Sequence, residues 1–257
     1  MIKDAFDLKR KTAIVTGAGR GLGRAMAEAL SEAGAAVVIA DKREQNIDET
    51  VKLIKSSGGK AIGIRCDVSN SESVKAMVEQ TIQDLDHIDI LVNNAGIARR
   101  IPLLEMTEEN WNKMLSVNLT GLFNCCRAVG LHMVSQRYGK IINIASTSGI
   151  EGEKGYTCYT ATKAGVILFT KSLALEWAQH NINVNAIGPG WFHTPMTDPL
   201  TKDPVRFEEI MRCIPKGRFA KPKEIGPLVV FLASEASDFM TGSITIMDGG
   251  QLAGVWS

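Results

Sequence analysis

Short apolar runs alternate with longer amphipathic stretches along the chain. A short, continuous apolar run is typical of a strand buried on both faces, whereas apolar residues at helical spacing indicate a helix. The predicted strands are 11–16, 36–40, 60–65, 88–92, 140–144, 182–187 and 243–247, and the predicted helices are 24–33, 44–57, 71–85, 111–135 and 160–180. This alternation predicts the α/β class, with a single doubly wound Rossmann-type parallel sheet and helices on both faces.

The alternation continues without a repeat, a low-complexity tract or a linker. We therefore expect a single domain over residues 1–257, in which dinucleotide and substrate bind together. One long irregular stretch, 188–206, is rich in Pro and Thr. A loop of that length usually has a function, and we expect it to cover the ligand site as a lid.

Composition and charge narrow the class of ligand. Hydrophobic residues make up 45% and charged residues 22%, as in ordinary globular proteins. The 29 basic and 28 acidic residues give a net charge of +1, which argues against nucleic acid or a membrane as partner and favours a small-molecule substrate. Residues 1–11 do not resemble a signal peptide, and no segment has the length of a membrane span, so we expect a cytoplasmic protein. The five cysteines include no CxxC pair, which predicts reduced thiols and no metal site.

A glycine-rich turn follows the first predicted strand. Residues 16–23 read TGAGRGLG and lead directly into the helix-forming run RAMAEAL. Glycines let the backbone turn tightly and approach a pyrophosphate, while a helix start offers free N–H groups and a positive dipole end. A plain connection can look similar, but the position between strand and helix favours a dinucleotide phosphate site. The candidate residues are Gly17, Arg20, Gly21, Leu22 and Gly23.

Asp41, at the end of the second predicted strand, affects the choice between NAD and NADP. A carboxylate there can accept hydrogen bonds from both adenosine ribose hydroxyls, and it repels a 2′-phosphate. Arg20, Lys42 and Arg43 can pair with such a phosphate, although charges at a helix start are often simply solvated. We give the carboxylate priority over solvated cations. NAD is therefore the expected cofactor, with NADP as the alternative.

Two further strand ends lie on the predicted binding edge. Asp67 and Val68 follow the third strand, where the carboxylate can accept from an adenine amino group. Residues 93–96 (NNAG) follow the fourth strand and bring backbone close to the cofactor. A simple turn explains either segment taken alone. The cofactor candidates from these segments are Asp67, Val68, Asn94, Ala95 and Gly96.

Tyr159 and Lys163 form the central catalytic candidate. They are four residues apart in a helical segment and therefore project from the same face. An isolated Tyr-x-x-x-Lys is usually a surface aromatic beside a solvated lysine. Here Ser146 follows the fifth strand and Asn118 lies in the preceding helical run, so four polar side chains can converge on one pocket.

These residues occur in the order of a known family. The motifs are Gly17-x-x-x-Gly21-x-Gly23, Asn93-Asn94-Ala95-Gly96, Asn118, Ser146, Tyr159-x-x-x-Lys163 and Pro189-Gly190. Over essentially its whole length the chain resembles the short-chain dehydrogenase/reductase family. Within that family it is most similar to the gluconate 5-dehydrogenases, notably at residues 94–100, 189–197 and 248–250. It also resembles 2-deoxy-gluconate and 2-keto-3-deoxygluconate dehydrogenases.

The resemblance implies a hydride-transfer reaction. Tyr159, as tyrosinate, removes the alcohol proton while hydride leaves for the cofactor, and we expect the Lys163 ammonium and the nicotinamide cation to lower its pKa. Ser146 is expected to hydrogen-bond the substrate oxygen and Lys163 to hold the nicotinamide ribose. Asn118 resembles the residue that positions a water in the proton path, although an Asn inside a helix is often only a backbone-bonding kink.

Further contacts are also implied by the resemblance alone. Pro189, Gly190 and Thr194 match positions that border the cofactor. The family also implies a homotetramer, formed through the helices that contain Trp111 and Tyr159 and through the C-terminal strand. Composition carries no information on either expectation.

Arg99 and Arg100 suggest the substrate class. They follow the fourth strand on the edge where substrate should lie, and a guanidinium binds a carboxylate through two hydrogen bonds. This pattern favours a sugar acid or keto acid, although solvated arginines or a subunit contact explain it almost as well. Trp191 and His193 can close over the substrate or merely pack a lid.

Three functions agree with the sequence. A sugar-acid dehydrogenase is the leading one, and a 3-oxoacyl-[acyl-carrier-protein] reductase shares every catalytic residue named above. A cofactor-binding sensor without turnover belongs to a different class. The complete set of Ser146, Tyr159 and Lys163 argues against such a sensor.

Overall fold

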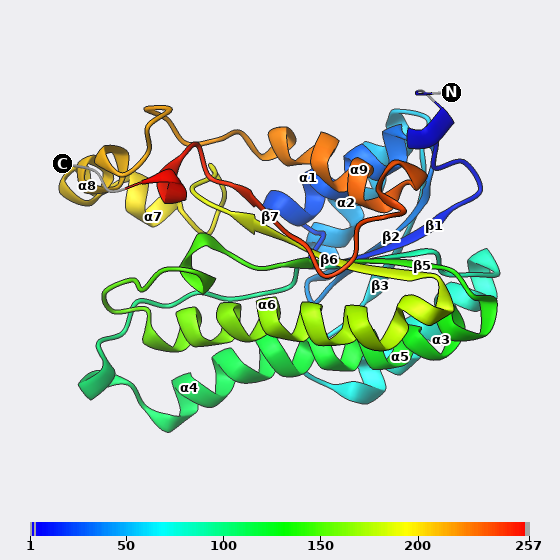
Figure 1. Cartoon of the computed structure of the whole chain (residues 1–257), viewed down its shortest axis with the longest axis horizontal. Coiled ribbons are helices and arrows are strands. Elements are labelled where there is room, and N and C mark those ends of the chain that lie inside the picture. Colours follow the sequence, from blue (N-terminus) through cyan, green and yellow to red (C-terminus); the bar gives the residue numbers. More distant parts are fainter. Residues whose placement is uncertain (1, 3, 255–257) are drawn as a thin grey trace.

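A computed structural model of the chain describes residues 2 and 4–254. The strands of this part form one seven-stranded sheet in the order β3-β2-β1-β4-β5-β6-β7, with all neighbours parallel (Figure 1). Their bounds are β1 (Thr12–Thr16), β2 (Ala36–Asp41), β3 (Lys60–Arg65), β4 (Ile90–Asn93), β5 (Gly139–Ile144), β6 (Ile182–Pro189) and β7 (Ile244–Met247). The predicted doubly wound parallel sheet is therefore confirmed.

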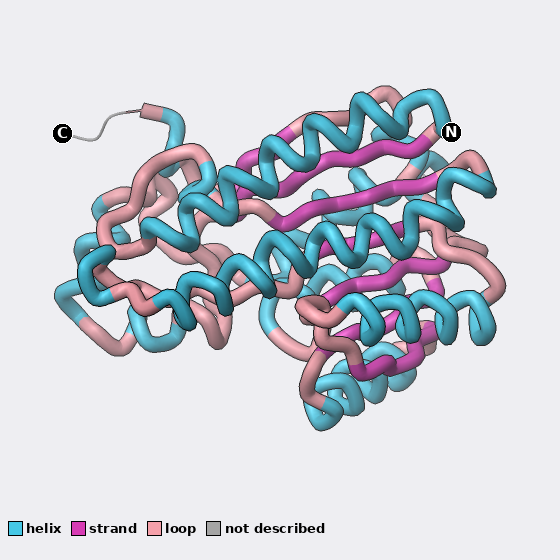
Figure 2. Tube along the Cα trace, turned by 90° about the horizontal axis from the view of Figure 1, so that it is seen from below, coloured by secondary structure: helices cyan, strands magenta, loops and turns pink. Residues whose placement is uncertain are grey.

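Helices cover both faces of this sheet. They are α1 (Gly21–Glu32), α2 (Glu44–Ser56), α3 (Ser71–Leu85), α4 (Glu108–Leu115), α5 (Gly121–Gln136), α6 (Thr157–Trp177), α7 (Asp198–Thr201), α8 (Pro204–Arg212) and α9 (Gly226–Ala233). Short 3-10 turns lie at Asp4–Phe6, Leu103–Glu105, Thr147–Gly149, Ala178–His180, Pro222–Ile225, Glu235–Ser237 and Gln251–Ala253. Helices α1, α2 and α9 pack on one face, and α3, α5 and α6 pack on the other, as Figures 1 and 2 show from two sides.

The strands are apolar because the sheet is buried from both sides. Successive residues of a strand point to opposite faces. Ala13 and Val15 of β1 accordingly belong to the core under α1, α2 and α9, and Ile14 belongs to the core under α3, α5 and α6. Every residue of β1, β4 and β5 is buried, which explains their continuous apolar runs.

The predicted helix 111–135 is wrong in detail. The helical region begins at Glu108 and consists of α4 and α5, joined by a π-helical turn at Ser116–Thr120. Asn118 lies in this turn and is buried. A single π turn barely disturbs the spacing of apolar residues, so periodicity does not reveal it, yet such turns frequently occur at functional sites.

The stretch 188–206 is also more regular than expected. It contains α7 and the start of α8, because the Asp203 side chain accepts the N–H groups of Val205 and Arg206 and Pro204 occupies the first turn. Ile210 of α8 packs with Ile214 and Phe219 in a small apolar cluster apart from the two main cores. The segment is therefore a compact helical module with its own packing.

Three expectations from the sequence, which concern disulfides, membrane spans and metal ligands, apply to the described part of the chain. All five cysteines are free, and Cys158, beside Tyr159, is fully buried as a small filler. No helix among residues 2 and 4–254 is long and apolar enough to cross a membrane. Those residues also contain no group of three or more His, Cys, Asp and Glu side chains suited to a metal ion.

Candidate functional site

The candidate site lies where the strand order reverses. From β1 the chain continues to β2 and β3 on one side of the sheet, and then crosses to β4 on the other side of β1. Such a reversal opens a crevice at the carboxyl ends of the strands. The predicted residues that follow β1, β2, β4, β5 and β6 therefore gather along one edge of the sheet.

The glycines of the glycine-rich turn are required both by close packing and by backbone conformation. Gly17 and Gly21 have φ of +63° and +59°, which L side chains rarely adopt. A Cβ on Gly17 would stand 2.9 Å from the Cα of Ala95, and one on Gly23 would overlap the Gly17 carbonyl. Helix α1 begins here without a side-chain cap, so its first N–H groups are available to a ligand such as a phosphate.

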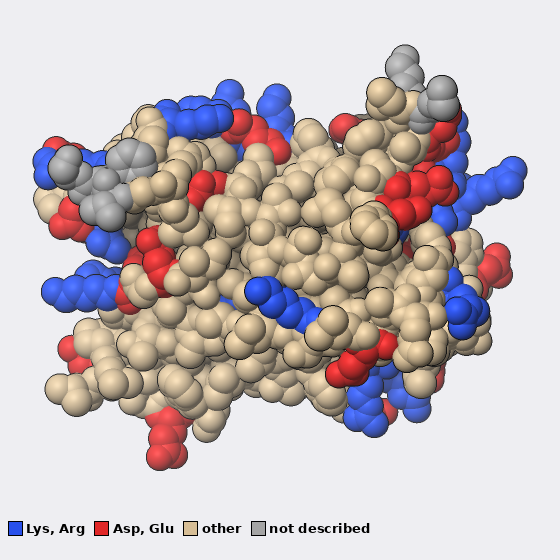
Figure 3. Space-filling view, in the orientation of Figure 1, with Lys and Arg blue, Asp and Glu red and all other residues tan. Residues whose placement is uncertain are grey.

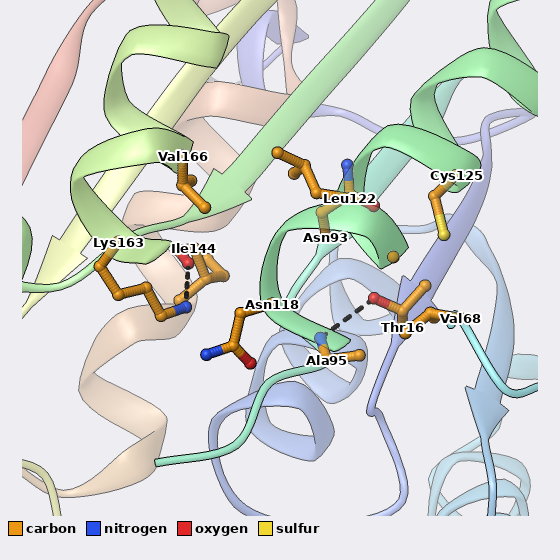
Figure 4. A pocket seen from close by; sticks show the side chains of 11 residues that line it. Thr16, Val68, Asn93, Ala95, Asn118, Leu122, Cys125, Ile144, Lys163 and Val166 are labelled. Atoms are coloured by element: carbon orange, nitrogen blue, oxygen red, sulfur yellow. Dashed lines mark hydrogen bonds between the residues drawn. The ribbon is translucent and has the colours of Figure 1, made fainter. Parts of the chain in front are cut away.

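The Asn94 side chain connects this turn to the end of β4 by hydrogen bonds. Its Nδ2 donates to the carbonyl oxygens of Thr16 at 2.9 Å and Gly17 at 3.1 Å. The Thr16 hydroxyl in turn accepts the N–H groups of Asn94 and Ala95, each at 3.1 Å; Figure 4 shows the second of these bonds. The 93–96 segment is thus hydrogen-bonded to the glycine-rich turn and is not a separate loop.

Asp41 faces the glycine-rich turn. The Gly19 N–H donates to its Oδ2 at 3.0 Å, and the Arg43 N–H donates to its Oδ1 at 3.1 Å. The carboxylate is therefore held at the end of β2, next to the turn, where the sequence predicts the adenosine ribose. Arg20 and Arg43 are exposed beside it.

Asp67 forms an ion pair and hydrogen bonds within the chain. The Lys42 ammonium lies 2.5 Å from its Oδ2, and Ser69 donates to its Oδ1 through both N–H and hydroxyl. Burial alone would raise the pKa of Asp67, but the hydrogen bonds from Lys42 and Ser69 outweigh it and lower the pKa to about 2. This ion pair also occupies Lys42, one of the three cations considered for a 2′-phosphate.

Val68 and Thr194 border the crevice from two sides. Val68 packs so closely on α5 that a Cβ on Gly121 would stand 2.7 Å from it. Thr194 lies opposite the glycine-rich turn, because a Cβ on Gly21 would meet its Cβ at 3.7 Å. Gly190 approaches the Cα of Asp248 so closely that a Cβ there would stand 2.8 Å from it.

Ser146, just after β5, lies near Tyr159 and Lys163, which share the first turns of α6. The Ser146 side chain acts on the Tyr159 hydroxyl and lowers its pKa, and the Nζ of Lys163 lies 5.7 Å from the centre of the Tyr159 ring. Lys163 also donates to the carbonyl oxygen of Ile144 at 2.7 Å, as Figure 4 shows. Ser146 and Lys163 are 8% and 5% exposed, so their polar groups act in a medium of low dielectric.

The pKa of Tyr159 differs from expectation. Burial raises it to about 12, the hydrogen bond to Ser146 opposes this rise, and the charge of Glu153 adds to it. Burial also lowers the pKa of Lys163 to about 8. Within the chain itself burial therefore works against the predicted lowering of the Tyr159 pKa, because it disfavours the charged form of both groups. A cation bound beside Tyr159 would act in the opposite direction.

Asn118 links three segments of the site. Its Oδ1 accepts the N–H of Ile97 at 2.8 Å, and its Nδ2 donates to the Ile97 carbonyl oxygen at 2.9 Å and to the Thr162 hydroxyl at 3.1 Å. The side chain thus joins the π turn to the segment after β4 and to α6. Both N–H bonds of the amide are used in this way, so the side chain holds these three segments together.

The two predicted substrate arginines point to different places. Arg99 donates to the side chain of Asn110 at 2.7 Å, on α4. Arg100 lies against the segment before α6, with its Cγ 3.0 Å from the position of a Cβ on Gly155. Burial raises the pKa of Tyr156, and the charge of Arg100 opposes this rise. Of the two arginines, Arg100 is therefore the one that acts on Tyr156 at the start of α6.

Trp191 and His193 pack the helical module rather than an open pocket. Their rings lie 5.8 Å and 5.2 Å from the Phe219 ring, and Phe207 of α8 contacts the same ring at 5.4 Å. His193 is exposed, and Trp191 is partly buried. The contacts match the alternative in which aromatic residues pack a lid.

Three polar residues near the catalytic set were not predicted. Glu153 accepts a hydrogen bond from the Ser148 hydroxyl at 3.1 Å and lies 3.3 Å from the Nη2 of Arg206 on α8. Burial raises the pKa of Glu153, while Ser148 and Arg206 oppose that rise. Glu153 and Arg206 are 53 residues apart in loop and lid segments, and no local motif in the sequence connects them.

Comparisons with known proteins agree with this geometry. A family model described as enoyl-(acyl carrier protein) reductase matches residues 17–251. The 2-dehydro-3-deoxy-D-gluconate 5-dehydrogenase of Bacillus subtilis (strain 168) is 43% identical over 252 residues, which cover 98% of each chain. The 3-oxoacyl-[acyl-carrier-protein] reductase FabG of Thermotoga maritima is 41% identical over 243 residues, covering 95% of this chain and 98% of that one.

A solved structure is similar over the whole fold. It is a gluconate 5-dehydrogenase from Burkholderia cenocepacia J2315 in complex with NADP and tartrate, with a TM-score of 0.96 and 36% identity over 99% of this chain and all of the other. These three relatives are named as a reductase and two dehydrogenases, which are all oxidoreductases. The chain belongs to the short-chain dehydrogenase/reductase family of nicotinamide-dependent oxidoreductases.

Proposed function

We propose that the chain interconverts a secondary alcohol and a ketone on a sugar acid, with a nicotinamide dinucleotide as hydride carrier. The observation that carries this proposal is the grouping of Tyr159 with the buried Ser146 and Lys163, together with the cation of Arg100 acting on Tyr156 beside it. A guanidinium next to a proton-transfer site suits an anionic substrate. The gluconate-type names of relatives support the same substrate class.

Each catalytic side chain has a role in the proposed reaction. Tyr159 accepts the alcohol proton during oxidation and returns it during reduction. Ser146 donates a hydrogen bond to the substrate oxygen, where charge develops. Lys163 holds the nicotinamide ribose and stabilises the tyrosinate, and Asn118 keeps α6 in register with the segment after β4. The bound nicotinamide accepts or supplies the hydride.

The residues at the strand ends fit a dinucleotide. Gly21 leaves no side chain between the turn and Thr194, and Gly17 and Gly23 allow the turn to pack closely on itself and on Ala95. The start of α1 has free N–H groups for a pyrophosphate. We assign the cofactor site to Gly17, Arg20, Gly21, Leu22, Gly23, Asp41, Asp67, Val68, Asn94, Ala95, Gly96, Tyr159, Lys163, Pro189, Gly190 and Thr194. The substrate site comprises Ser146, Tyr159 and Arg100, with Arg99, Trp191 and His193 as outer candidates.

NAD is the proposed cofactor, because Asp41 is held against the glycine-rich turn and Lys42 is occupied by Asp67. We expect Asp41→Ala to reduce the ratio of kcat/KM for NAD to that for NADP by about tenfold or more, since the ribose loses two hydrogen bonds and the 2′-phosphate loses a repelling charge. Steady-state kinetics with both cofactors measures this ratio.

Asp41→Asn separates the two causes in this experiment. The amide oxygen can still accept a hydrogen bond, but the negative charge is gone, so most of any gain in NADP use should appear already in this variant. A relative of known structure binds NADP. The ratio of kcat/KM for NAD to that for NADP is therefore informative for the wild-type protein as well. A wild-type preference for NADP would contradict the NAD assignment and point to Arg20 and Arg43.

A substrate screen tests the proposed function. NADH and NADPH absorbance would be followed with five- and six-carbon sugar acids, their keto forms and matching neutral polyols. We expect turnover of at least one sugar acid, with a lower KM than for the polyol of the same length. Absence of turnover on every sugar acid, with clear turnover elsewhere, would reject this substrate class.

A 3-oxoacyl-[acyl-carrier-protein] reductase activity is the second candidate, because a relative of that name is 41% identical over nearly the whole chain. Acetoacetyl thioester belongs in the same screen, and a kcat/KM far above that for sugar acids would favour this function. The third reading, a cofactor-binding sensor, requires tight NADH binding without turnover on any alcohol or ketone.

A homotetramer in the cytoplasm remains our proposal for the assembly and location. Large apolar side chains are exposed on the outer faces of α5 and α6, namely Phe123, Leu131, Leu168 and Leu175. Figure 3 also shows a broad, largely uncharged surface between the charged ends of the molecule. Light scattering after gel filtration tests the tetramer. We further propose that residues 1–257 act as one domain.

A further inference from the structure

A series of polar contacts runs from α8 to the catalytic hydroxyls. The Arg206 Nη2 lies 3.3 Å from the Glu153 Oε1, and the Ser148 hydroxyl donates to the Glu153 Oε2 at 3.1 Å. The Ser148 N–H donates to the Ser146 Oγ at 3.1 Å, and the Ser146 side chain in turn lowers the pKa of Tyr159. The two oxygens of Glu153 are thus bound to different elements, one to α8 and the other to the catalytic serine segment.

The Arg206 side chain is held in place for this contact. Its Nη1 pairs with the Glu209 Oε2 at 3.0 Å on the same helix, which orients the guanidinium. Its Nε is buried and has no hydrogen-bond partner within the described residues, an arrangement that costs free energy. The Arg206 side chain is only 23% exposed, so its guanidinium is largely removed from solvent and packs against Glu153.

Helix α8 can carry this contact as a unit. Phe207, Ile210 and Met211 pack with Phe219 in a small apolar cluster that is separate from both main cores. A displacement of the helical module therefore leaves the sheet and its two cores intact. Arg206 would move with the module, whereas Glu153 belongs to the segment that leads into α6.

We propose that Glu153 and Arg206 are a positioning pair through which closure of α8 acts on the Ser146 and Tyr159 hydroxyls. With α8 over the site, Arg206 neutralises Glu153 and holds its carboxylate against Ser148. With α8 withdrawn, Glu153 faces Tyr159 as an unpaired negative charge, which disfavours tyrosinate. The pair favours formation of the base in the covered site, from which water is excluded.

The electrostatic surroundings of Tyr159 agree with this role. Burial is the largest cause of the rise in the pKa of Tyr159 to about 12, and the negative charge of Glu153 contributes to the same rise. The charged and titratable groups near Tyr159 and its neighbours are Lys163 and Tyr156 from α6 and its start, Glu153 and Glu151 from the preceding segment, Arg206 from α8 and Arg100 from the segment after β4. The geometry therefore offers Glu153 one guanidinium in direct contact and a second nearby.

The pH dependence of kcat/KM for alcohol oxidation tests the pair. Glu153→Gln should shift the rising limb to lower pH by about one unit, because it removes a negative charge near Tyr159. Arg206→Gln should shift the limb to higher pH, because Glu153 is left uncompensated. The double variant should match Glu153→Gln, since Arg206 has no charge left to neutralise.

Two further variants separate this role from a structural one. Arg206→Lys keeps the charge and should return the limb toward its wild-type position. Arg212→Gln removes a cation from the same helix that pairs with Glu208 at 2.7 Å on the exposed side, and it should leave the limb unchanged. If Glu153→Gln fails to fold, the comparison of Arg206→Gln with Arg206→Lys decides the question.

The proposal is overturned if both single neutral variants keep the wild-type limb, or if their shifts simply add in the double variant. It rests on Tyr159 as the acid/base of the proposed function, but it does not depend on the substrate. The limb can be measured with any alcohol that the enzyme accepts. Failure on sugar acids with a normal limb shift would therefore reject the substrate class alone.

Discussion

Tyr159→Phe is expected to reduce turnover at least a hundredfold to a thousandfold, because it removes the transferring proton and keeps the ring. The Tyr159 side chain lies close to the buried Ser146 and Lys163, and no other tyrosine has a lysine one helical turn away. Cofactor affinity should change little, since Lys163 and the glycine-rich turn are untouched. Steady-state kinetics and fluorescence titration with NADH measure the two effects separately.

Tyr156→Phe is the matched control for this experiment. Its ring meets the Tyr159 ring edge-on at 6.2 Å, so the two tyrosines share much of their environment. Tyr156 has Thr160 four residues later in place of a lysine, and we expect the variant to keep turnover within about tenfold of wild type. Near-normal turnover of Tyr159→Phe would overturn the proposed mechanism.

The fold was predictable from the sequence because its strongest signals are local. Apolar runs such as 140–144 mark strands buried on both faces, and the alternation with helices fixes the parallel sheet. Helix α8 was missed, although Asp203 before Pro204 is a recognisable helix start. The π turn at Asn118 leaves no comparable mark, because one additional residue in a helix hardly changes the apolar spacing.

The site was predictable only where its residues follow strands or share a helix face. Ser146 follows β5, and Tyr159 and Lys163 are one turn apart, so the topology brings them together. Glu153 and Arg206 meet through the position of α8, which depends on tertiary packing around Phe219. The high pKa of Tyr159 likewise results from burial, a quantity that residue spacing does not contain.

Arg100→Ala is expected to raise the KM for a sugar acid about tenfold to a hundredfold, for a cost of roughly 1.5 to 3 kcal/mol when a hydrogen bond to a charged group is lost. A matching neutral polyol should be spared, because it offers no carboxylate. Arg100→Lys should recover part of the affinity, since an ammonium keeps the charge but lacks the planar fork. Kinetics on the acid and the polyol measure the difference.

Arg99→Ala provides the comparison on the adjacent residue. The Arg99 guanidinium donates to Asn110 on α4 at 2.7 Å, whereas the charge of Arg100 acts on Tyr156 and Glu153. If the carboxylate lies beside Tyr159, Arg99→Ala should change the KM for the acid by less than about twofold, as expected for a solvated charge. The opposite ranking would move the carboxylate toward α4. If Arg100→Ala raises the KM for the acid and for the polyol equally, the physical reason for choosing a sugar acid is removed. The guanidinium would then contribute to the site without binding the carboxylate of the substrate.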